Sequence, residues 1–385
     1  MQTSAKSLEA WQVVSGGIAG LVLCIGLGRF AYTPMLPLMQ QQAGLSDAMA
    51  GALAAINYAG YMSGALIAAW IDDPRWRQRL YSHGLWLSLL SCVLMALAPN
   101  VWVWALARYL GGLCGAAGML LGSGLVLGWL MRAGRRPELG LHFTGLGLGI
   151  VVSALGAMGM ALLRLDWAHQ WKGYALIGLI FLVPAWAWRP PAPPPAASAA
   201  ASAPARRWMA LMIAMYFCAG WGFVINATFT VAIVERQPLL AGQGPWAWLL
   251  VGVAATPAVF LWDRVARRLG DVQALLLAFV LQTIGVLLPA LSGSLFAALA
   301  GALLYGATFI GIVSLTLALV GRRSPANPGK AMARLTLSYG MAQIGAPALS
   351  GAMVQASGGY AGALWLTGAV LVLGMGLLLA MLRVD

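Results

Sequence analysis

The chain has 385 residues, of which 61% are hydrophobic and only 9% are charged. An average soluble domain is about 25% charged, so these residues could not give a globule of this length a water-compatible surface. Twelve membrane-spanning helices of about 20 residues each would use about 240 positions, which leaves no room for a large domain outside the bilayer. The composition therefore excludes an ordinary soluble protein and predicts an integral membrane protein.

Charge clusters and Gly or Pro punctuation divide the apolar sequence into twelve runs. Helix is the expected structure because lipid cannot satisfy open backbone groups, and no run has the alternation of a barrel strand. The predicted fold class is an all-α membrane protein with two six-helix bundles related by a pseudo-twofold axis. The predicted spans are residues 11–40, 48–71, 80–98, 101–131, 139–163, 170–188, 207–235, 245–262, 272–290, 293–321, 331–356 and 359–382.

A segment of different composition separates the first six spans from the last six. Residues 189–207 read RPPAPPPAASAAASAPARR, which contains no large apolar side chain and is typical of a linker. The predicted organisation is a tail at 1–10, a six-helix bundle at 11–188, a linker at 189–206 and a second bundle at 207–385. An offset of 194 residues aligns Gly28 with Gly222 and Gly112 with Gly306, as expected for parallel repeats.

The basic residues recur at every second loop. With the N-terminus in the cytoplasm, 18 of the 23 Lys and Arg residues fall in cytoplasmic segments, where positive charge is retained. This distribution predicts that both termini and the linker are cytoplasmic. A nucleic-acid-binding patch, the other interpretation of a net charge of +13, does not explain the periodic placement, so no nucleic-acid partner is expected.

Residue types that carry enzyme or metal chemistry are scattered along the chain. The four cysteines lie within apolar runs without the paired spacing of a metal or redox motif, and the three histidines form no ligand pattern. No nucleophile elbow, phosphate-binding loop or carboxylate pair occurs. We therefore expect no enzymatic activity, no metal site and no cofactor.

Six short segments of the chain carry recognisable motifs: DRVARR at 263–268, GRFAYTPMLP at 28–37, NYAGYMSG at 57–64, NATF at 226–229, GATF at 306–309 and SYGMAQIGAP at 338–347. DRVARR resembles the cytoplasmic signature of the major facilitator superfamily, and the other five segments resemble the YbfB/YjiJ-type branch of that superfamily. The resemblance implies a twelve-helix transporter of the bacterial inner membrane with the major facilitator fold. It also implies a gating role for the charges of the signature, which are Asp263, Arg264, Arg267 and Arg268.

Two arginines lie inside predicted spans. Arg29 is about 18 residues, or about 27 Å of helix, into the first span, too deep for its side chain to reach the membrane surface easily. A charge at this depth is costly and usually faces an aqueous cavity or a partner. Arg108 begins RYLGG, which resembles the R-x-x-x-G motif of the superfamily's fourth helix, linked there to proton-coupled export. Each arginine also has a structural interpretation. Arg29 could be bonded to helix carbonyls, and Arg108 could lie near the outer membrane interface.

Polar side chains in otherwise apolar helices complete the predicted substrate site. Each fits equally well in a cavity wall or in a hydrogen bond between helices. Besides Arg29 and Arg108, the candidate substrate-binding residues are Tyr32, Asn57, Tyr58, Asn226, Thr228, Tyr339 and Gln343.

The predicted function follows from the charges at membrane depth. Asp47, Asp166 and Glu235 fall near helix ends, and two deep arginines without an acid favour an anionic substrate. The sequence predicts a secondary active transporter, working by alternating access, for a small anionic or carboxylate-bearing organic solute. Proton-coupled efflux of amphipathic compounds is one alternative, and a non-transporting membrane receptor or scaffold is an alternative of another class. The expected partners are a small-molecule substrate, membrane lipid and protons as a candidate coupling ion, and the expected state is a monomer.

Overall fold

The computed structural model describes residues 8–71, 73–135, 139–192, 206–323 and 328–383, and the regular elements in these ranges are all helices. The first half holds α1 (Ala10–Leu21), η1 (Val22–Phe30), α2 (Tyr32–Ala43), α3 (Asp47–Trp70), α4 (Pro74–Leu97), α5 (Val101–Ala116), η2 (Ala117–Gly122), α6 (Ser123–Arg132), α7 (Leu139–Leu162) and α8 (Trp167–Ala187). The second half holds α9 (Arg206–Glu235), α10 (Gly244–Ala255), α11 (Ala258–Leu269), α12 (Asp271–Leu291), α13 (Leu295–Arg323), α14 (Pro328–Ser357) and α15 (Ala361–Met381). Residues 1–7 of the predicted tail and 193–205 of the predicted linker lie outside the described residues.

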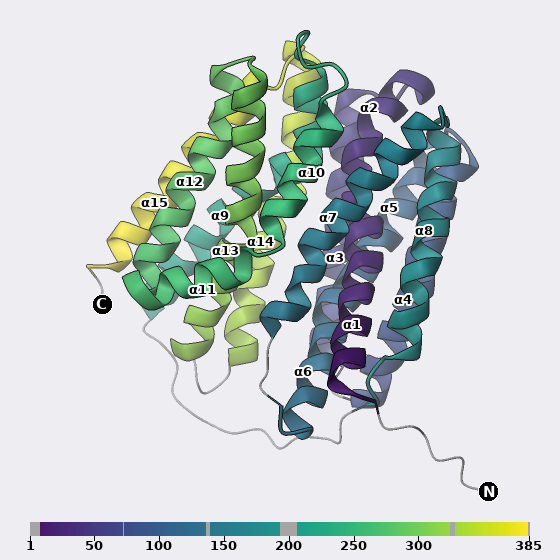
Figure 1. Cartoon of the computed structure of the whole chain (residues 1–385). Coiled ribbons are helices and arrows are strands. Elements are labelled where there is room, and N and C mark those ends of the chain that lie inside the picture. The colour runs from purple at the N-terminus through teal and green to yellow at the C-terminus, as the bar shows by residue number, and fades with distance from the viewer. Residues whose placement is uncertain (1–7, 72, 136–138, 193–205, 324–327, 384–385) are drawn as a thin grey trace, which may run out of the picture.

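These elements form twelve rods that run side by side (Figure 1). The first rod is α1, η1 and α2, the fourth is α5, η2 and α6, and the eighth is α10 and α11, whereas every other rod is one helix. In the described ranges, nine helical stretches are long and apolar enough to cross a membrane, and the bent α10–α11 pair makes ten. The other two rods, α8 and α14, have 21 and 30 residues. We call the face where α1 begins and α15 ends the terminal face, and the other the opposite face.

The two halves repeat the same close packing. A Cβ atom at Gly112 of α5 would lie 1.9 Å from the carbonyl oxygen of Asn57 in α3, and one at Gly306 of α13 would lie 2.4 Å from that of Val251 in α10. The offset of 194 residues that aligns Gly112 with Gly306 also aligns Asn57 with Val251. Lipid provides little hydrophobic driving force for helix association, so membrane helices are held together largely by van der Waals packing. Small residues such as these glycines allow the helix backbones to come close enough for that packing. The predicted twelve-helix fold with two repeated halves is confirmed.

The halves meet through the helix pairs α2 with α9, α3 with α14, and α7 with α10. Thr33 of α2 donates a hydrogen bond to the carbonyl oxygen of Ala227 in α9. These two residues are themselves 194 positions apart. Because residues related by a twofold axis meet only where that axis passes, the pseudo-twofold axis runs between α2 and α9 at this contact.

The third and eighth spans differ from their predicted limits. The third was expected at 80–98, but α4 begins at Pro74 because Asp73 accepts a hydrogen bond of 2.8 Å from the backbone N–H of Arg75, and proline is preorganised for a first helical position. The eighth was expected as one span at 245–262, but α10 and α11 are bent by 49° around Pro257, which has no backbone N–H for the helix ladder. The segment DRVARR, predicted as a loop, therefore lies on α11.

Candidate substrate site

A cavity of about 120 Å³ lies between the two halves, near the middle of the rods. The elements α3, α7, η1 and η2 line it from the first half, and α9, α13 and α14 line it from the second half. Its walls are mainly aromatic and aliphatic. The polar and titratable side chains among its lining residues are Arg29, Tyr61, Tyr216, Thr336, Tyr339 and Gln343. We call it the central cavity.

Arg29 lies in a π-helical turn of the first rod. The backbone N–H of Ala31 bonds to the carbonyl of Gly26, five residues earlier, at 2.9 Å. A second π-helical segment, η2, packs against η1, where a Cβ at Gly118 would lie 2.7 Å from Cβ of Cys24. Such segments are rare and are frequent at functional sites. The two segments meet beside the central cavity, which residues of both η1 and η2 line.

The guanidinium of Arg29 is held between two tyrosine rings without a counter-charge. Its Cζ lies 4.6 Å from the ring centroid of Tyr58 and 4.5 Å from that of Tyr61. Arg29 is only 8% exposed, and its Nε and Nη2 atoms are buried without a hydrogen-bond partner. Within the described residues, no carboxylate forms an ion pair with it. A desolvated cation–π contact contributes about 2 kcal/mol, whereas an uncompensated buried charge costs several kcal/mol, so the two rings offset only part of the cost of burying this guanidinium.

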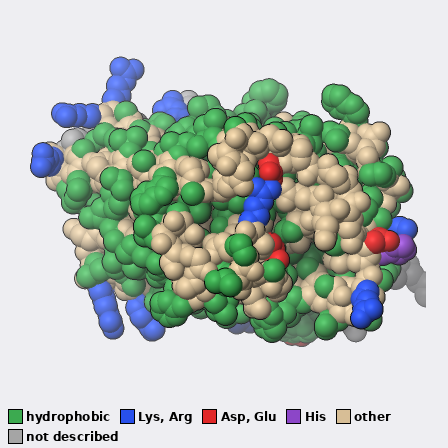
Figure 2. Space-filling model, turned by 90° about the horizontal axis from the view of Figure 1, so that it is seen from above, with side chains coloured by type: hydrophobic (Ala, Val, Ile, Leu, Met, Phe, Trp, Pro, Cys, Tyr) green, Lys and Arg blue, Asp and Glu red, His purple; other side chains and the backbone are tan. Residues whose placement is uncertain are grey.

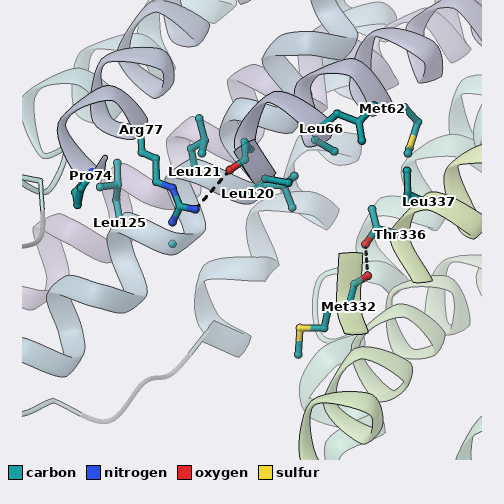
Figure 3. Close-up of a pocket in the computed structure, with 14 residues that line it drawn as sticks. Met62, Leu66, Pro74, Arg77, Leu120, Leu121, Leu125, Met332, Thr336 and Leu337 are labelled. Carbon is teal, nitrogen blue, oxygen red and sulfur yellow. Dashed lines mark hydrogen bonds between the residues drawn. The ribbon is translucent and has the colours of Figure 1, made fainter. Parts of the chain in front are cut away.

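A second cavity, of about 310 Å³, adjoins the central cavity on the side of the terminal face. We call it the vestibule, and Figure 3 shows its lining from α3, α4, η2, α6 and α14. Leu120 and Thr336 line both cavities. At the rim, Arg77 donates a hydrogen bond of 3.4 Å to the carbonyl of Ala68. The two cavities therefore adjoin each other between η2 and α14.

The opposite face is closed above the central cavity. Asp47, at the start of α3, forms an ion pair of 2.5 Å with Arg236, which follows α9. Deeper between the halves, a Cβ at Gly51 of α3 would lie 2.2 Å from the carbonyl oxygen of Pro347 in α14. Partial burial by itself lowers the pKa of Arg236, but the hydrogen bond to Asp47 raises this pKa above its usual value. Figure 2 shows acidic and basic side chains side by side near the centre of this face. In this conformation a cavity lies on the terminal-face side of the central cavity, whereas an ion pair and close helix packing lie on the opposite side.

Arg108 lies behind the wall of the central cavity and does not line it. Its Nε donates to the carbonyl of Leu53 at 3.4 Å, and its Nη1 donates to the carbonyls of Gly28 and Arg29 at 3.5 Å each. Its Cζ lies 4.2 Å from the ring centroid of Tyr32. Arg108 therefore connects the first, second and fourth rods, while Arg29 faces the cavity.

Two other predicted residues also connect rods. Asn57 is fully buried, and its Nδ2 donates to the carbonyl of Arg108 at 2.8 Å and to that of Gly28 at 3.2 Å. The hydroxyl of Tyr32 donates to the carbonyl of Ala50 at 3.1 Å. These contacts fix the backbone on which Arg29 is carried.

Of the remaining five predicted residues, two line the central cavity and one contacts the Arg29 guanidinium. Tyr339 and Gln343 of α14 line it, and among the described residues none forms a hydrogen bond with the side-chain amide of Gln343. Tyr58 carries one face of the Arg29 guanidinium, and its hydroxyl lies beside Thr228 of α9. Asn226 of α9 is buried with an unpartnered Oδ1.

An aromatic wall in the second half was not predicted as part of the site. It consists of Tyr216, Phe223, Phe309 and Tyr339, of which only Tyr339 was among the candidates. The signal was present in the repeat, because the offset of 194 residues places Phe223 at the position equivalent to Arg29. The two halves therefore contribute different chemistry at one level: a cation from the first and aromatic rings from the second.

The predicted gating charges stay on one helix in this conformation. Asp263 pairs with Arg267, four residues on, and these side chains are 58% and 72% exposed. Arg264 and Arg268 are also exposed. An exposed pair at this spacing stabilises a helix by about 0.3–0.5 kcal/mol. No ion pair joins these four residues to the first half within the described ranges.

Cysteine and histidine side chains are not grouped for metal chemistry. All four cysteines are buried and free, and His142 is buried with its Nε2 2.8 Å from the hydroxyl of Ser123. In the part of the chain that the structure describes, no three His, Cys, Asp or Glu side chains gather into a group that could hold a metal ion.

Two repeated six-rod halves around a central cavity are the architecture of major facilitator transporters. The sequence matches the family model described as "Uncharacterised MFS-type transporter YbfB" over residues 21–379, and the chain belongs to this family of membrane transporters. The predicted family is thereby confirmed. Members of the family and the solved structures of similar fold are transporters rather than enzymes. No curated protein matches the sequence.

Solved structures with the same fold are distant in sequence. Two crystal structures of the nucleoside transporter NupG, one of a mutant form, have TM-scores of 0.76 and 0.73 at 14% identity, covering 97% of this chain and 99% of that one. The human organic anion transporter MFSD10 (TETRAN) has a TM-score of 0.67 at 16% identity, covering 97% of this chain and 100% of that one. These similarities establish the fold.

Proposed function

We propose that this transporter is a secondary active carrier that works by alternating access and binds a small anionic or carboxylate-bearing organic solute through Arg29. The observation that carries the proposal is the unpaired guanidinium at the central cavity. A carboxylate can accept two parallel N–H bonds from an arginine, and it would supply the counter-charge that Arg29 lacks. One of the fold neighbours is named an organic anion transporter, but at 16% identity this likeness supports the fold rather than the substrate.

The proposed cycle uses the two halves as rigid units. Residues 11–188 rock against residues 207–385, and the present conformation, with its vestibule open, alternates with one in which the Asp47–Arg236 ion pair is broken. Asp263, Arg264, Arg267 and Arg268 bias this equilibrium when α11 approaches the first half. The charge distribution supports placement in a bacterial inner membrane with both termini and the linker in the cytoplasm, so that the vestibule opens to the cytoplasm.

A ligand-class screen tests the proposal. Purified protein is heated with panels of organic acids, amino acids and cationic drugs, because a ligand that binds the folded state raises the melting temperature by mass action. We expect carboxylates to give the largest shifts and Arg29→Ala to lose them, whereas Arg132→Gln, a matched change at an exposed arginine of α6, keeps them. If cationic amphipathic compounds give the largest shifts and Arg29→Ala retains them, the proposal fails and drug efflux becomes the better account.

A further inference from the structure

The central cavity contains aromatic rings from both halves, but they have different neighbours. In the first half, Tyr58 and Tyr61 present their faces to the Arg29 guanidinium, so those faces are already occupied by a cation. In the second half, the rings of Phe223 and Phe309 line the same cavity without a cation against them. A ligand that reaches Arg29 therefore lies against the aromatic wall.

The rings of this wall are in mutual contact. Phe223 lies 5.3 Å from Phe309 and 6.0 Å from Tyr339 between ring centroids, the latter pair being stacked at 29°. Tyr339 also lies 4.5 Å from Tyr216. Across the two halves, Tyr58 meets Phe223 at 6.5 Å with the rings at 86°. Tyr58 thus touches both the guanidinium and the wall, which places the cation and Phe223 at adjacent parts of one cavity.

We propose that the substrate of this site is an aromatic carboxylate: a flat ring that stacks on Phe223 and Phe309 while its carboxylate pairs with Arg29. This inference rests on the proposed function and names its substrate class. Aromatic pairs prefer offset-stacked or edge-to-face arrangements, which contribute beyond the burial of apolar area. An aliphatic carboxylate of equal size gains the burial but not this ring contribution.

The polarity of the central cavity fits such a ligand, and its size limits the ligand to a single ring. An apolar protein cavity of about 150 Å³ binds benzene, so the central cavity, of about 120 Å³, must widen to enclose a ring with its carboxylate, or the ligand must extend toward the adjoining vestibule. Arg29 supplies charged donors at one end, and the unpartnered amide of Gln343 offers a second polar contact. The aromatic faces alone would also suit an organic cation, but the neighbouring guanidinium repels one. The combined chemistry selects an anion with a ring.

The test compares ligands matched for charge and size. Dissociation constants of benzoate, cyclohexanecarboxylate and neutral benzamide are measured by calorimetry with the full-length protein in detergent. We expect benzoate to bind roughly 2- to 10-fold more tightly than cyclohexanecarboxylate, and benzamide to bind least. Phe223→Leu and Phe309→Leu should bring the ratio of the two carboxylates close to one. Phe223→Tyr should retain it, because the ring is kept.

A matched control separates the wall from general packing. Phe229→Leu changes a buried ring on the same helix that contacts Tyr360 and does not line the cavity, so the benzoate preference should persist. If both carboxylates bind equally to the parent, or if Phe229→Leu abolishes the preference as fully as Phe223→Leu, the aromatic inference is overturned while anion binding stands. If benzamide binds as tightly as benzoate, or neither carboxylate binds, the proposed function is overturned as well.

Discussion

Asp47 and Arg236 join the two halves of the transporter at its opposite face through an ion pair of 2.5 Å. Asp47 also accepts a hydrogen bond of 2.7 Å from the Nε2 of Gln40, and the Arg236 guanidinium lies 5.1 Å from the ring centroid of Tyr360. The pair is only partly exposed, with side-chain exposures of 16% for Asp47 and 35% for Arg236. In the proposed cycle this ion pair holds the opposite face closed and separates when that face opens.

Asp47→Asn is expected to favour opening of the opposite face. Loss of a partly exposed ion pair changes the free-energy difference between the closed and open conformations by about 0.5–1 kcal/mol, or roughly 2- to 5-fold in their population ratio. With the native cysteines replaced by alanine and a cysteine placed at buried Thr33, where α2 meets α9, a membrane-impermeant maleimide applied at the opposite face should label the Asp47→Asn variant faster. The control is the same cysteine variant with Asp47 intact. Equal labelling rates would show that the ion pair does not hold this face closed.

Close helix packing gives a second prediction, with a control on the same rod. Gly112→Ala would place a Cβ 1.9 Å from the backbone oxygen of Asn57, and such overpacking costs about 1–3 kcal/mol. Gly124→Ala meets nothing within 4 Å and gains helix propensity of about 1 kcal/mol. Melting of the purified variants should show Gly112→Ala, and its repeat equivalent Gly306→Ala, below the parent and Gly124→Ala at or above it. Equal melting of Gly112→Ala and Gly124→Ala would refute the packing argument.

A third prediction concerns pH and the cap of α8. Asp166 accepts hydrogen bonds from the backbone N–H and from the side chain of His169. These two bonds, the backbone one having the larger effect, lower the pKa of Asp166 below its usual value of 3.8. A carboxyl whose pKa is lowered on folding stabilises the fold fully above the unfolded pKa and loses that effect as the pH falls through the folded pKa. Asp166→Ala should therefore melt below the parent at pH 7, and the difference should shrink as the pH falls below 3.8. A difference that is the same at pH 7 and pH 3 would contradict this assignment.

The sequence was sufficient to predict the rods and the repeat because both follow from local patterns. Runs of apolar residues bounded by charge specify membrane helices, and Gly112 and Gly306 occupy equivalent positions that pack in equivalent ways. The bend at Pro257 was not predicted, because the apolar run continues through it to Trp262. The π-helical register of η1 was also not predicted, since a continuous apolar run does not distinguish a π-helical from an α-helical register.

The different environments of the two arginines also could not be predicted from the sequence. Arg29 and Arg108 both lie inside apolar runs. An arginine in such a run can either line a cavity or form structural hydrogen bonds with neighbouring helices. The partners that decide between these come from other rods: Leu53 and Gly28 supply carbonyls to Arg108, whereas Tyr58 and Tyr61 give Arg29 only ring faces. These contacts exist only once the bundle has assembled.

The most direct test of Arg29 as the anion-binding residue is uptake of labelled benzoate into proteoliposomes by the parent and by Arg29→Lys. Lysine keeps the positive charge but lacks the planar fork that pairs with both carboxylate oxygens. We expect uptake by Arg29→Lys to fall at least about tenfold, the equivalent of one charge-assisted hydrogen bond of roughly 1.5 kcal/mol, while its melting temperature stays close to that of the parent. Uptake by a correctly folded Arg29→Lys or Arg29→Ala at the rate of the parent would contradict the central claim that Arg29 binds the anionic group of the substrate.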